Sequence, residues 1–367
     1  MEYIFIFVLV VILANNYKYL SYKDQYIFIL FIAVYIILLM GLRYRVGMDT
    51  LNYMSSYNFA PTFKEFNNLD FSETRFEPGY LLLCSLCKSI TPDFWLLQLL
   101  HSLILCICVF KFIKKNVINP FIGIAVYMYL AWLYFNTEII RESLAIGVFL
   151  LNYSNLKENK LIKYYIISFI SISFHFSAII TLFFPLVKYL RFNVLYIIAC
   201  ILIVMIIPFA EQLTSYINII SITNRIDEHI SSADTLNFNW RIANLIKNVS
   251  VSIISVIIYR KLKIKSDLTP FILFNILMGI GAFSIPIIFS RLSNYTLPFV
   301  IIYVANLISL LAEYKCKFIK FTLIVFLFLS QLFYYKDMFY AWYPYVSIFN
   351  KNIVYEREKL FNNYFNQ

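Results

Sequence analysis

Long apolar runs separated by short basic joints recur along the whole chain. A membrane-crossing helix needs about 20 residues, so the longer runs can cross a bilayer, while runs of about 12 to 14 residues must tilt or stop partway. Membrane barrel strands would instead alternate apolar and polar residues in segments of about ten. We therefore predict an all-α, polytopic integral membrane bundle of about 11–13 transmembrane or half-membrane helices. The runs lie at approximately 2–14, 26–42, 79–90, 94–113, 118–135, 138–153, 161–174, 176–190, 194–209, 241–260, 269–290, 294–312 and 318–335.

Composition excludes the soluble globular class. The chain is 61% hydrophobic and 14% charged, whereas soluble domains are apolar at about half of their positions. The net charge of +11 comes mostly from the short joints. That placement indicates membrane topology and some attraction to anionic lipid, so we expect a lipid bilayer and no nucleic acid as partner.

The basic joints also predict which way the chain faces, because cytoplasmic joints carry an excess of Lys and Arg. We assign these joints to the cytoplasm, and the opposite, extracytoplasmic side then receives residues 43–78 and 210–240. We expect one transmembrane domain over 1–336, followed by an extracytoplasmic tail over 337–367, in a bacterial inner membrane. The cytoplasmic joints lie near residues 18–23, 111–115, 157–163, 188–191, 260–265 and 315–320.

Two regions are too short for simple spans. The run 79–90 is predicted to be a re-entrant or interfacial half-helix, because an odd number of crossings must separate residue 78 from residue 111. Residues 161–190 begin and end with cytoplasmic basic residues, so we expect a hairpin with arms of about 21 Å, short of a bilayer core of about 30 Å. Its tip, at His175, would then lie within the membrane and line a polar cavity.

Unusual polar residues gather on the predicted extracytoplasmic side, where they indicate a cationic cavity with carboxylates. Arginines at span ends also serve as anchors to lipid phosphates. A local ion pair of Arg141 with Glu138 or Glu142 is a further alternative, and His175 alone could be a buried structural histidine. The residues are Arg43, Arg45, Asp49, Arg75, Glu77, Tyr80, Glu138, Arg141, Glu142, His175 and Arg291.

The segment RYRVGMD after the second run has a geometry of its own. Arg43 and Arg45 would point apart on a helix but share a face on an extended backbone. Gly41 and Gly47 permit such a departure from helix. Two guanidiniums on one face would suit a pyrophosphate, since arginine offers fork-shaped, permanently charged donors.

Five segments, in order, resemble the EpsG-like family of bacterial polysaccharide polymerases, which includes Wzy-type O-antigen polymerases. They are GLRYRVGMDTLNY, FEPGYLLL, IIRESLAIGVFLL, FHFSAII and SRLSNY, and the resemblance covers roughly residues 25–300. It implies a GT-C-like membrane glycosyltransferase in the inner membrane. The enzyme would join lipid-linked oligosaccharides at the periplasmic face, with undecaprenyl pyrophosphate as carrier and leaving group. It leaves open whether a chain-length regulator protein binds.

Such a reaction must neutralise a departing pyrophosphate and deprotonate a sugar hydroxyl. Arginines can do the first, and Arg141 and Arg291 would thereby act in catalysis. The reaction needs no cofactor, and arginines could replace a metal, although a divalent cation stays an alternative. The candidate pyrophosphate ligands are Arg43, Arg45, Arg141 and Arg291. The candidate bases, left unranked, are Asp49, Glu77 and His175. The candidate sugar-binding residues are Tyr53 and Tyr80, which could instead be interfacial packing.

Two other functions would use similar charges. A flippase for the same lipid-linked oligosaccharide also needs a cationic cavity, but such transporters often consist of two related halves, and no internal repeat is visible here. An O-antigen ligase would also use arginines and a histidine at the outer leaflet. We therefore keep both as alternatives to the polymerase.

Overall fold

The computed structural model describes residues 2–68, 74, 76–193, 249–284, 286–313 and 339–350, with single residues at 195, 196, 198, 200, 202, 318, 321 and 322. Within these residues the chain forms helices and turns and no strand, which confirms the all-α class. The predicted loop 210–240, Arg75, and residues 323–335 of the predicted run 318–335 lie outside the described residues.

The chain divides into two compact units. The first comprises Met1–Ile179 and Asp337–Gln367, and the second comprises Ile180–Lys336. The single transmembrane domain over 1–336, followed by a tail over 337–367, stays a prediction. In the first unit the helices are α1 (Glu2–Asn16), α2 (Tyr22–Gly41), α3 (Met48–Phe59), α4 (Pro78–Ile90), α5 (Trp95–Asn116), α6 (Pro120–Tyr127), α7 (Leu133–Thr137), α8 (Ile140–Lys157), α9 (Leu161–Phe174) and α20 (Phe339–Trp342). In the second unit they are α10 (Phe184–Val187), α15 (Val251–Lys261), α16 (Thr269–Ser284), α17 (Pro286–Asn294) and α18 (Leu297–Glu313).

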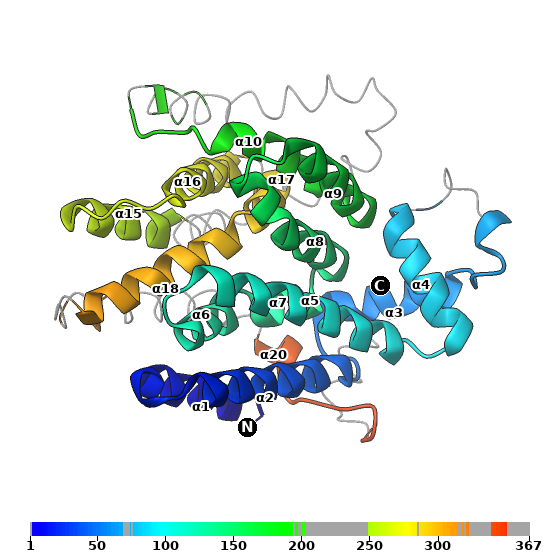
Figure 1. Ribbon diagram of the computed structural model, residues 1–367. Helices are drawn as coiled ribbons and strands as arrows, with labels where there is room; N and C mark the ends of the chain where they lie inside the picture. Colours follow the sequence, from blue (N-terminus) through cyan, green and yellow to red (C-terminus); the bar gives the residue numbers. More distant parts are fainter. Residues whose placement is uncertain are drawn as a thin grey trace. The chain divides into compact units, whose positions relative to one another are not determined.

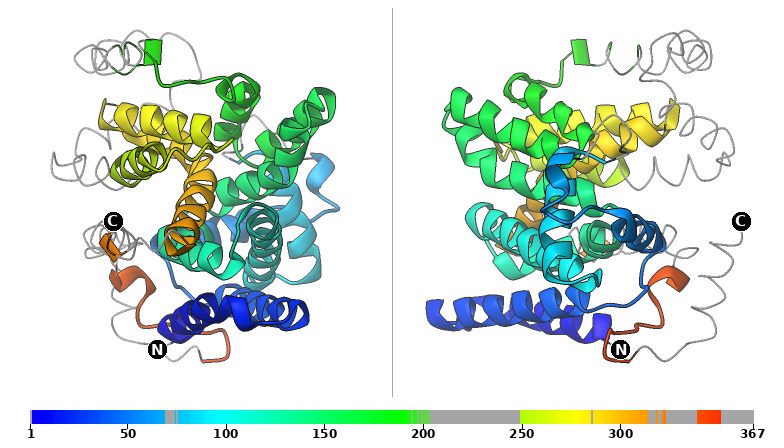
Figure 2. Two further views of the ribbon diagram at one scale, coloured as in Figure 1. Left: turned by 60° about the vertical axis from the view of Figure 1, so that its left-hand side comes forward. Right: turned by 90° about the vertical axis from the view of Figure 1, so that its right-hand side faces the viewer.

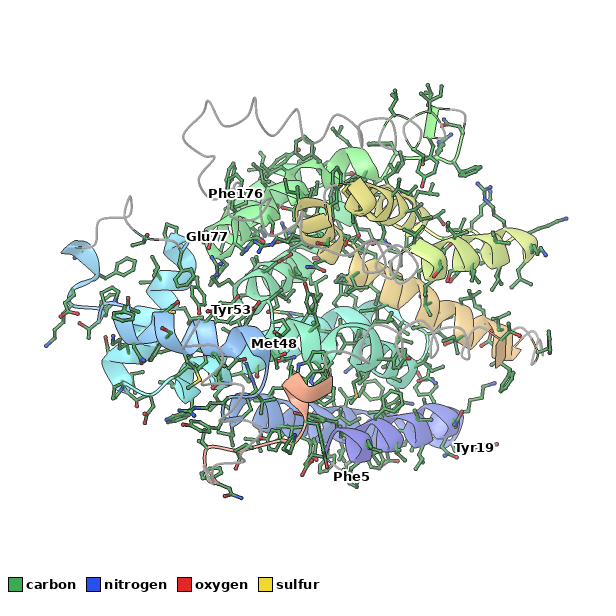
Figure 3. All side chains as sticks on the ribbon, turned by 180° about the vertical axis from the view of Figure 1, so that it is seen from behind. Phe5, Tyr19, Met48, Tyr53, Glu77 and Phe176 are labelled. Atoms are coloured by element: carbon green, nitrogen blue, oxygen red, sulfur yellow. The ribbon has the colours of Figure 1, made fainter. Side chains whose placement is uncertain are left out.

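Three helical segments of the described chain are long and apolar enough to cross a membrane: Glu2–Tyr19, Tyr22–Gly41 and Trp95–Asn116. A fourth candidate is the pair Ile288–Asn294 and Leu297–Glu313, bent by 51° at its break. Phe5 and Phe31 on the first two segments are 57% and 50% exposed, and Figure 3 shows Phe5 on an outer face. Apolar surface of this extent is typical of helices that contact lipid. The chain is therefore a helical membrane protein.

The short helices occur where the apolar runs are short. Helix α4 has 13 residues and α9 has 14, so each is about 20 Å long and falls short of a bilayer core. Helix α9 ends at Phe174, and a 3-10 segment begins at Phe176. His175 lies at the break with an extended backbone, φ −158° and ψ 129°.

Helix α8 packs against both α5 and α9, and α4 packs against α5 and α9 (Figure 1). One buried cluster joins α3, α4, α5 and α8, and Cys84 and Cys87 lie in it as unpaired core side chains. The cluster packs along α4 through Tyr80, Cys84 and Cys87. Its buried members are Tyr57, Ala60, Tyr80, Cys84, Cys87, Phe94, Leu97, Ile140 and Leu144.

Helix α3 was not expected, because residues 43–78 read as a loop. It is a polar helix, so a search for apolar runs passes over it. Gly47 precedes it with φ +100°, and a Cβ there would lie 2.5 Å from Cβ of Thr137. Both facts require glycine at this position.

The C-terminal residues 339–350 hold the segment that leads into α3. The backbone N–H of Tyr44 donates to the carbonyl of Val346, and that of Gly47 donates to the carbonyl of Ala341, each at 2.8 Å. The Tyr3 hydroxyl donates to the carbonyl of Trp342 at 3.2 Å. Figure 2 accordingly shows α20 beside the N-terminal helices. These residues are therefore built into the first unit.

The second unit has a core of its own. Helix α16 packs against α15, α17 and α18. The rings of Phe271 and Phe299 stack at 4.5 Å between centroids. The buried side chain of Asn275 donates to the hydroxyl of Ser252 and accepts from the hydroxyl of Thr296. This polar bridge fixes α16 between its neighbours.

Candidate functional site

An ion pair joins α4 to α8. Nη1 of Arg141 lies 2.6 Å from Oε2 of Glu77, and the two side chains are 15% and 17% exposed. Glu77 is the residue directly before α4, whose first position is Pro78, and Arg141 lies in the first turn of α8. Helix starts suit Glu77, because the exposed N–H groups and the helix dipole favour an anion there. The ion pair thus joins two residues that the sequence analysis assigned to the extracytoplasmic side.

The chain at the end of α9, next to His175, contacts this ion pair. The second oxygen of Glu77, Oε1, accepts the backbone N–H of Phe176 at 3.1 Å, and Figure 3 shows the two residues side by side. Gly79 lies against the end of α9, where an added Cβ would come within 2.4 Å of Oγ of Ser173. Three helix ends, those of α4, α8 and α9, therefore meet at one carboxylate.

Aromatic rings surround the guanidinium of Arg141. Its Cζ lies 4.5 Å from the ring centroid of Phe76 and 6.0 Å from that of Tyr80, within the range of cation–π attraction. Tyr53 of α3 contacts the ring of Tyr80 edge-on at 6.2 Å, and the charge of Arg141 acts on its hydroxyl. Burial raises the pKa of Tyr53 above its ordinary value. Nε of Arg141 is buried and has no hydrogen-bond partner among the described residues.

His175 lies next to this group of residues and is 6% exposed. Its Nδ1 lies 2.6 Å from the hydroxyl of Ser177 and accepts the backbone N–H of the same residue at 3.2 Å. These two contacts fix the orientation of the ring. The structure therefore brings Glu77, Arg141, Tyr53, Tyr80 and His175 into one neighbourhood of the first unit.

Arg43 and Arg45 do not share an extended face, and the expected geometry of this segment is wrong. Arg43 is fully buried, and its guanidinium donates to the main-chain carbonyls of Met40, Val46 and Asn136. Arg45 adopts a left-handed backbone, φ +53°, and its Cζ lies 5.1 Å from the ring centroid of Tyr44. A left-handed residue turns the chain, so the two side chains diverge.

The anion that the start of α3 would attract is supplied by the protein itself. The buried carboxylate of Glu138 accepts the backbone N–H groups of Met48 at 3.3 Å and Asp49 at 3.0 Å. A substrate phosphate would compete for these same donors. Asp49 lies in the first turn of α3 with an exposed side chain.

Arg291 and His101 each have surroundings of their own. Arg291 lies in the last turn of α17, in the second unit, and is partly exposed. His101 is fully buried, with Nε2 2.8 Å from the hydroxyl of Ser143. Sequence reasoning missed Phe76, although its aromatic ring directly before Glu77 was a signal. It also missed Lys88, whose Nζ donates to the carbonyl of Asn58 at the end of α3. No group of three or more His, Cys, Asp or Glu residues in the described part of the chain could hold a metal ion.

Comparison with known proteins gives one match. A family model for the EpsG family matches residues 26–347, which is most of the chain and includes every candidate residue named above. Neither the curated proteins nor the solved structures gave a match. The GT-C-like architecture therefore stays a prediction. The chain belongs to the EpsG family, and it is accordingly a membrane protein of polysaccharide synthesis.

Proposed function

We propose that this protein is a polysaccharide polymerase of the bacterial inner membrane. It transfers a glycan chain from undecaprenyl pyrophosphate onto the next lipid-linked repeat unit, at the periplasmic face. The observation that carries the proposal is the Glu77–Arg141 pair, because it sets a carboxylate and a guanidinium 2.6 Å apart beneath aromatic rings where three helix ends meet.

The reaction balances without a further reactant. A hydroxyl oxygen of the acceptor sugar forms a bond to the anomeric carbon of the donor chain, and the bond from that carbon to the pyrophosphate oxygen breaks. The hydroxyl proton goes to a carboxylate of the protein, and the electron pair leaves with the pyrophosphate. The site must therefore accept one proton and stabilise a growing negative charge.

Arg141 suits the second task. Its guanidinium keeps a buried Nε donor with no hydrogen-bond partner among the described residues, while Nη1 contacts Glu77. An arginine fork can bind two phosphate oxygens at once. Arg45 and Arg291 stay proposed as further pyrophosphate ligands. We assign Arg43 to holding the fold, because its donors end on main-chain carbonyls.

Glu77 is the base that the contacts favour. An incoming pyrophosphate competes with Glu77 for Arg141, and the carboxylate that it displaces is then able to take the proton. His175 is less suited, because its Nδ1 already accepts the N–H of Ser177. Asp49 lies exposed in the first turn of α3. Tyr53 and Phe76 are partly exposed and would contact the sugar, while Tyr80 is buried behind them.

Deletion of the gene, followed by electrophoresis of the surface polysaccharide, tests the proposal. The wild-type gene should restore a ladder of chain lengths, whereas Arg141→Ala and Glu77→Gln should leave a single repeat unit. The matched control is Glu158→Gln, which removes one carboxylate from an exposed ion pair with Lys160 and should leave the ladder intact. Complete absence of repeat units in the deletion strain would instead indicate a flippase or a ligase.

The predicted orientation has a separate test. A reporter fused after Lys115 should be cytoplasmic. In a cysteine-free background, Asn58→Cys at the exposed end of α3 should react with a membrane-impermeant maleimide added outside the inner membrane. Labelling of this cysteine only after the membrane is opened would put the site in the wrong compartment.

A further inference from the structure

Helix α3 is held at both ends by charged side chains from distant parts of the chain. At its start, the carboxylate of Glu138 accepts the N–H groups of Met48 and Asp49. At its end, Nζ of Lys88 donates to the carbonyls of Tyr57 at 3.3 Å, Asn58 at 2.7 Å and Ala60 at 2.5 Å. Each charge has the sign that the helix dipole favours at that end.

The cap at the start of α3 comes from elsewhere because the local residue cannot provide it. The N-cap position is Gly47, which has no side chain. Glu138 lies about 90 residues further on, at the break between α7 and α8. A helix start usually takes its cap from Ser, Thr, Asp or Asn at the N-cap itself. Here the cap also ties α3 to the element that precedes Arg141.

Neighbouring side chains fix the carboxylate of Glu138. Oγ1 of Thr137 lies 2.9 Å from its Oε1, and Nε1 of Trp342 donates to that Oγ1 at 2.8 Å. Glu138 is 5% exposed. A carboxylate held in this way by N–H donors and a hydroxyl has little freedom to move, so it can fix the start of α3.

Tyr53 follows one helical turn after Asp49, on the same face of α3. Its ring contacts Tyr80, whose ring centroid lies 6.0 Å from Cζ of Arg141, and the charge of Arg141 acts on its hydroxyl. We infer that Glu138 is a positioning residue, which sets the start of α3 so that Tyr53 lies against Arg141. Lys88 sets the other end. Glu138 itself contacts backbone N–H groups and takes no part in the proton transfer.

This inference rests on the proposed function for its activity readout, so the experiment adds a readout that does not depend on activity. Amide hydrogen exchange is measured over residues 49–53 in wild type, Glu138→Ala and Glu138→Gln, beside the polysaccharide ladder. The control is Asp24→Ala, which removes a carboxylate from the first turn of another helix, α2. Loss of a cap should speed exchange at the start of α3 about tenfold in Glu138→Ala and shorten the ladder.

Glu138→Gln keeps an acceptor oxygen for the N–H of Asp49. It should therefore exchange within about threefold of wild type and restore most of the ladder. A Glu138→Gln protein with normal exchange and no ladder would assign the carboxylate to the chemistry and overturn the inference. Unchanged exchange in Glu138→Ala would overturn it as well, because the cap would then not hold α3.

A variant at the other end covers the case in which Glu138→Ala fails to accumulate. Lys88→Met should speed exchange near residues 56–59 and leave residues 49–53 close to wild type. Equally faster amide exchange along the whole of α3 would contradict the inference that Glu138 and Lys88 hold its two ends independently. If the wild-type gene fails to restore any ladder, the proposed function fails, and the exchange data still test the cap by themselves.

Discussion

Two buried or largely buried arginines of the first unit, Arg43 and Arg141, differ in what their donors contact. Arg43 is fully buried and donates to three main-chain carbonyls. Arg141 is 15% exposed, and Nη1 donates to the carboxylate of Glu77. Main-chain carbonyls cannot leave without unfolding the segment, whereas a carboxylate can be displaced by a stronger anion. The contacts of an arginine, more than its place in the sequence, therefore indicate whether it holds the fold or a substrate.

The largest expected difference concerns Arg43→Met and Arg141→Met. Removing Arg43 leaves three buried carbonyls without their donor and should lower the stability of the protein by about 3 kcal/mol or more. Arg141→Met leaves the carboxylate of Glu77 without its cation, so it should cost some stability, but less than Arg43→Met because the pair is partly exposed. It should reduce polymerisation about 100-fold. Thermal unfolding in detergent and the ladder, normalised to protein amount, measure the two effects. Equal loss of stability in both variants would remove the distinction between the arginines.

Gly47→Ala tests whether the start of α3 needs the positive φ angle of the residue before it. The substitution forces an L-residue to φ +100° and places a Cβ 2.5 Å from that of Thr137, which should cost about 1–3 kcal/mol. Gly147→Ala in α8 is the matched control, because its Cβ would meet Cys108 at 3.4 Å, an ordinary contact. Unfolding temperatures of the two variants make the comparison. A Gly47→Ala protein as stable as Gly147→Ala would show that the loop does not need this backbone conformation.

A pair of tyrosine variants gives the smallest effects. Tyr53→Phe removes the hydroxyl on which the charge of Arg141 acts and should slow polymerisation about five-fold at unchanged stability. Tyr345→Phe removes the hydrogen bond to the carbonyl of Leu39 and should lower stability by about 1 kcal/mol without changing the rate per molecule. Measuring rate and unfolding on both proteins is sufficient. A loss of stability in Tyr53→Phe together with a slower rate in Tyr345→Phe would contradict the account, because Tyr345 would then serve the reaction and Tyr53 the fold.

Much of the helical fold was predictable, because the apolar runs coincide with α1, α2, α5, α8, α9 and α18. Helix α3 was not, since a polar helix leaves no apolar signal and depends on charges from Glu138 and Lys88 at its ends. The role of the C-terminal residues was also hidden. Tyr345 bonds to Leu39 across 306 positions of sequence, and no local pattern encodes a contact at that separation.

The candidate site was predictable in its residue types but not in its pairings. Glu138 and Arg141 are three positions apart and would be neighbours on one helix. The helix breaks between them: Ile139 has φ −122° and ψ 48°, and α8 begins only at Ile140. Arg141 consequently pairs with Glu77, 64 positions away. A short break in the backbone, invisible in the composition, thus decided which carboxylate meets the arginine.

The most direct test of the central claim exchanges the two charges of the site. The double variant Glu77→Arg with Arg141→Glu keeps an ion pair between α4 and α8 but reverses which side carries the cation. Protein amount and unfolding temperature are measured with the polysaccharide ladder in the deletion strain. We predict a membrane-located protein with a lowered unfolding temperature, because arginine at position 77 cannot accept the N–H of Phe176, and it should yield a single repeat unit and no ladder. A restored ladder would contradict the account, because the pair would then serve only to join the two helices.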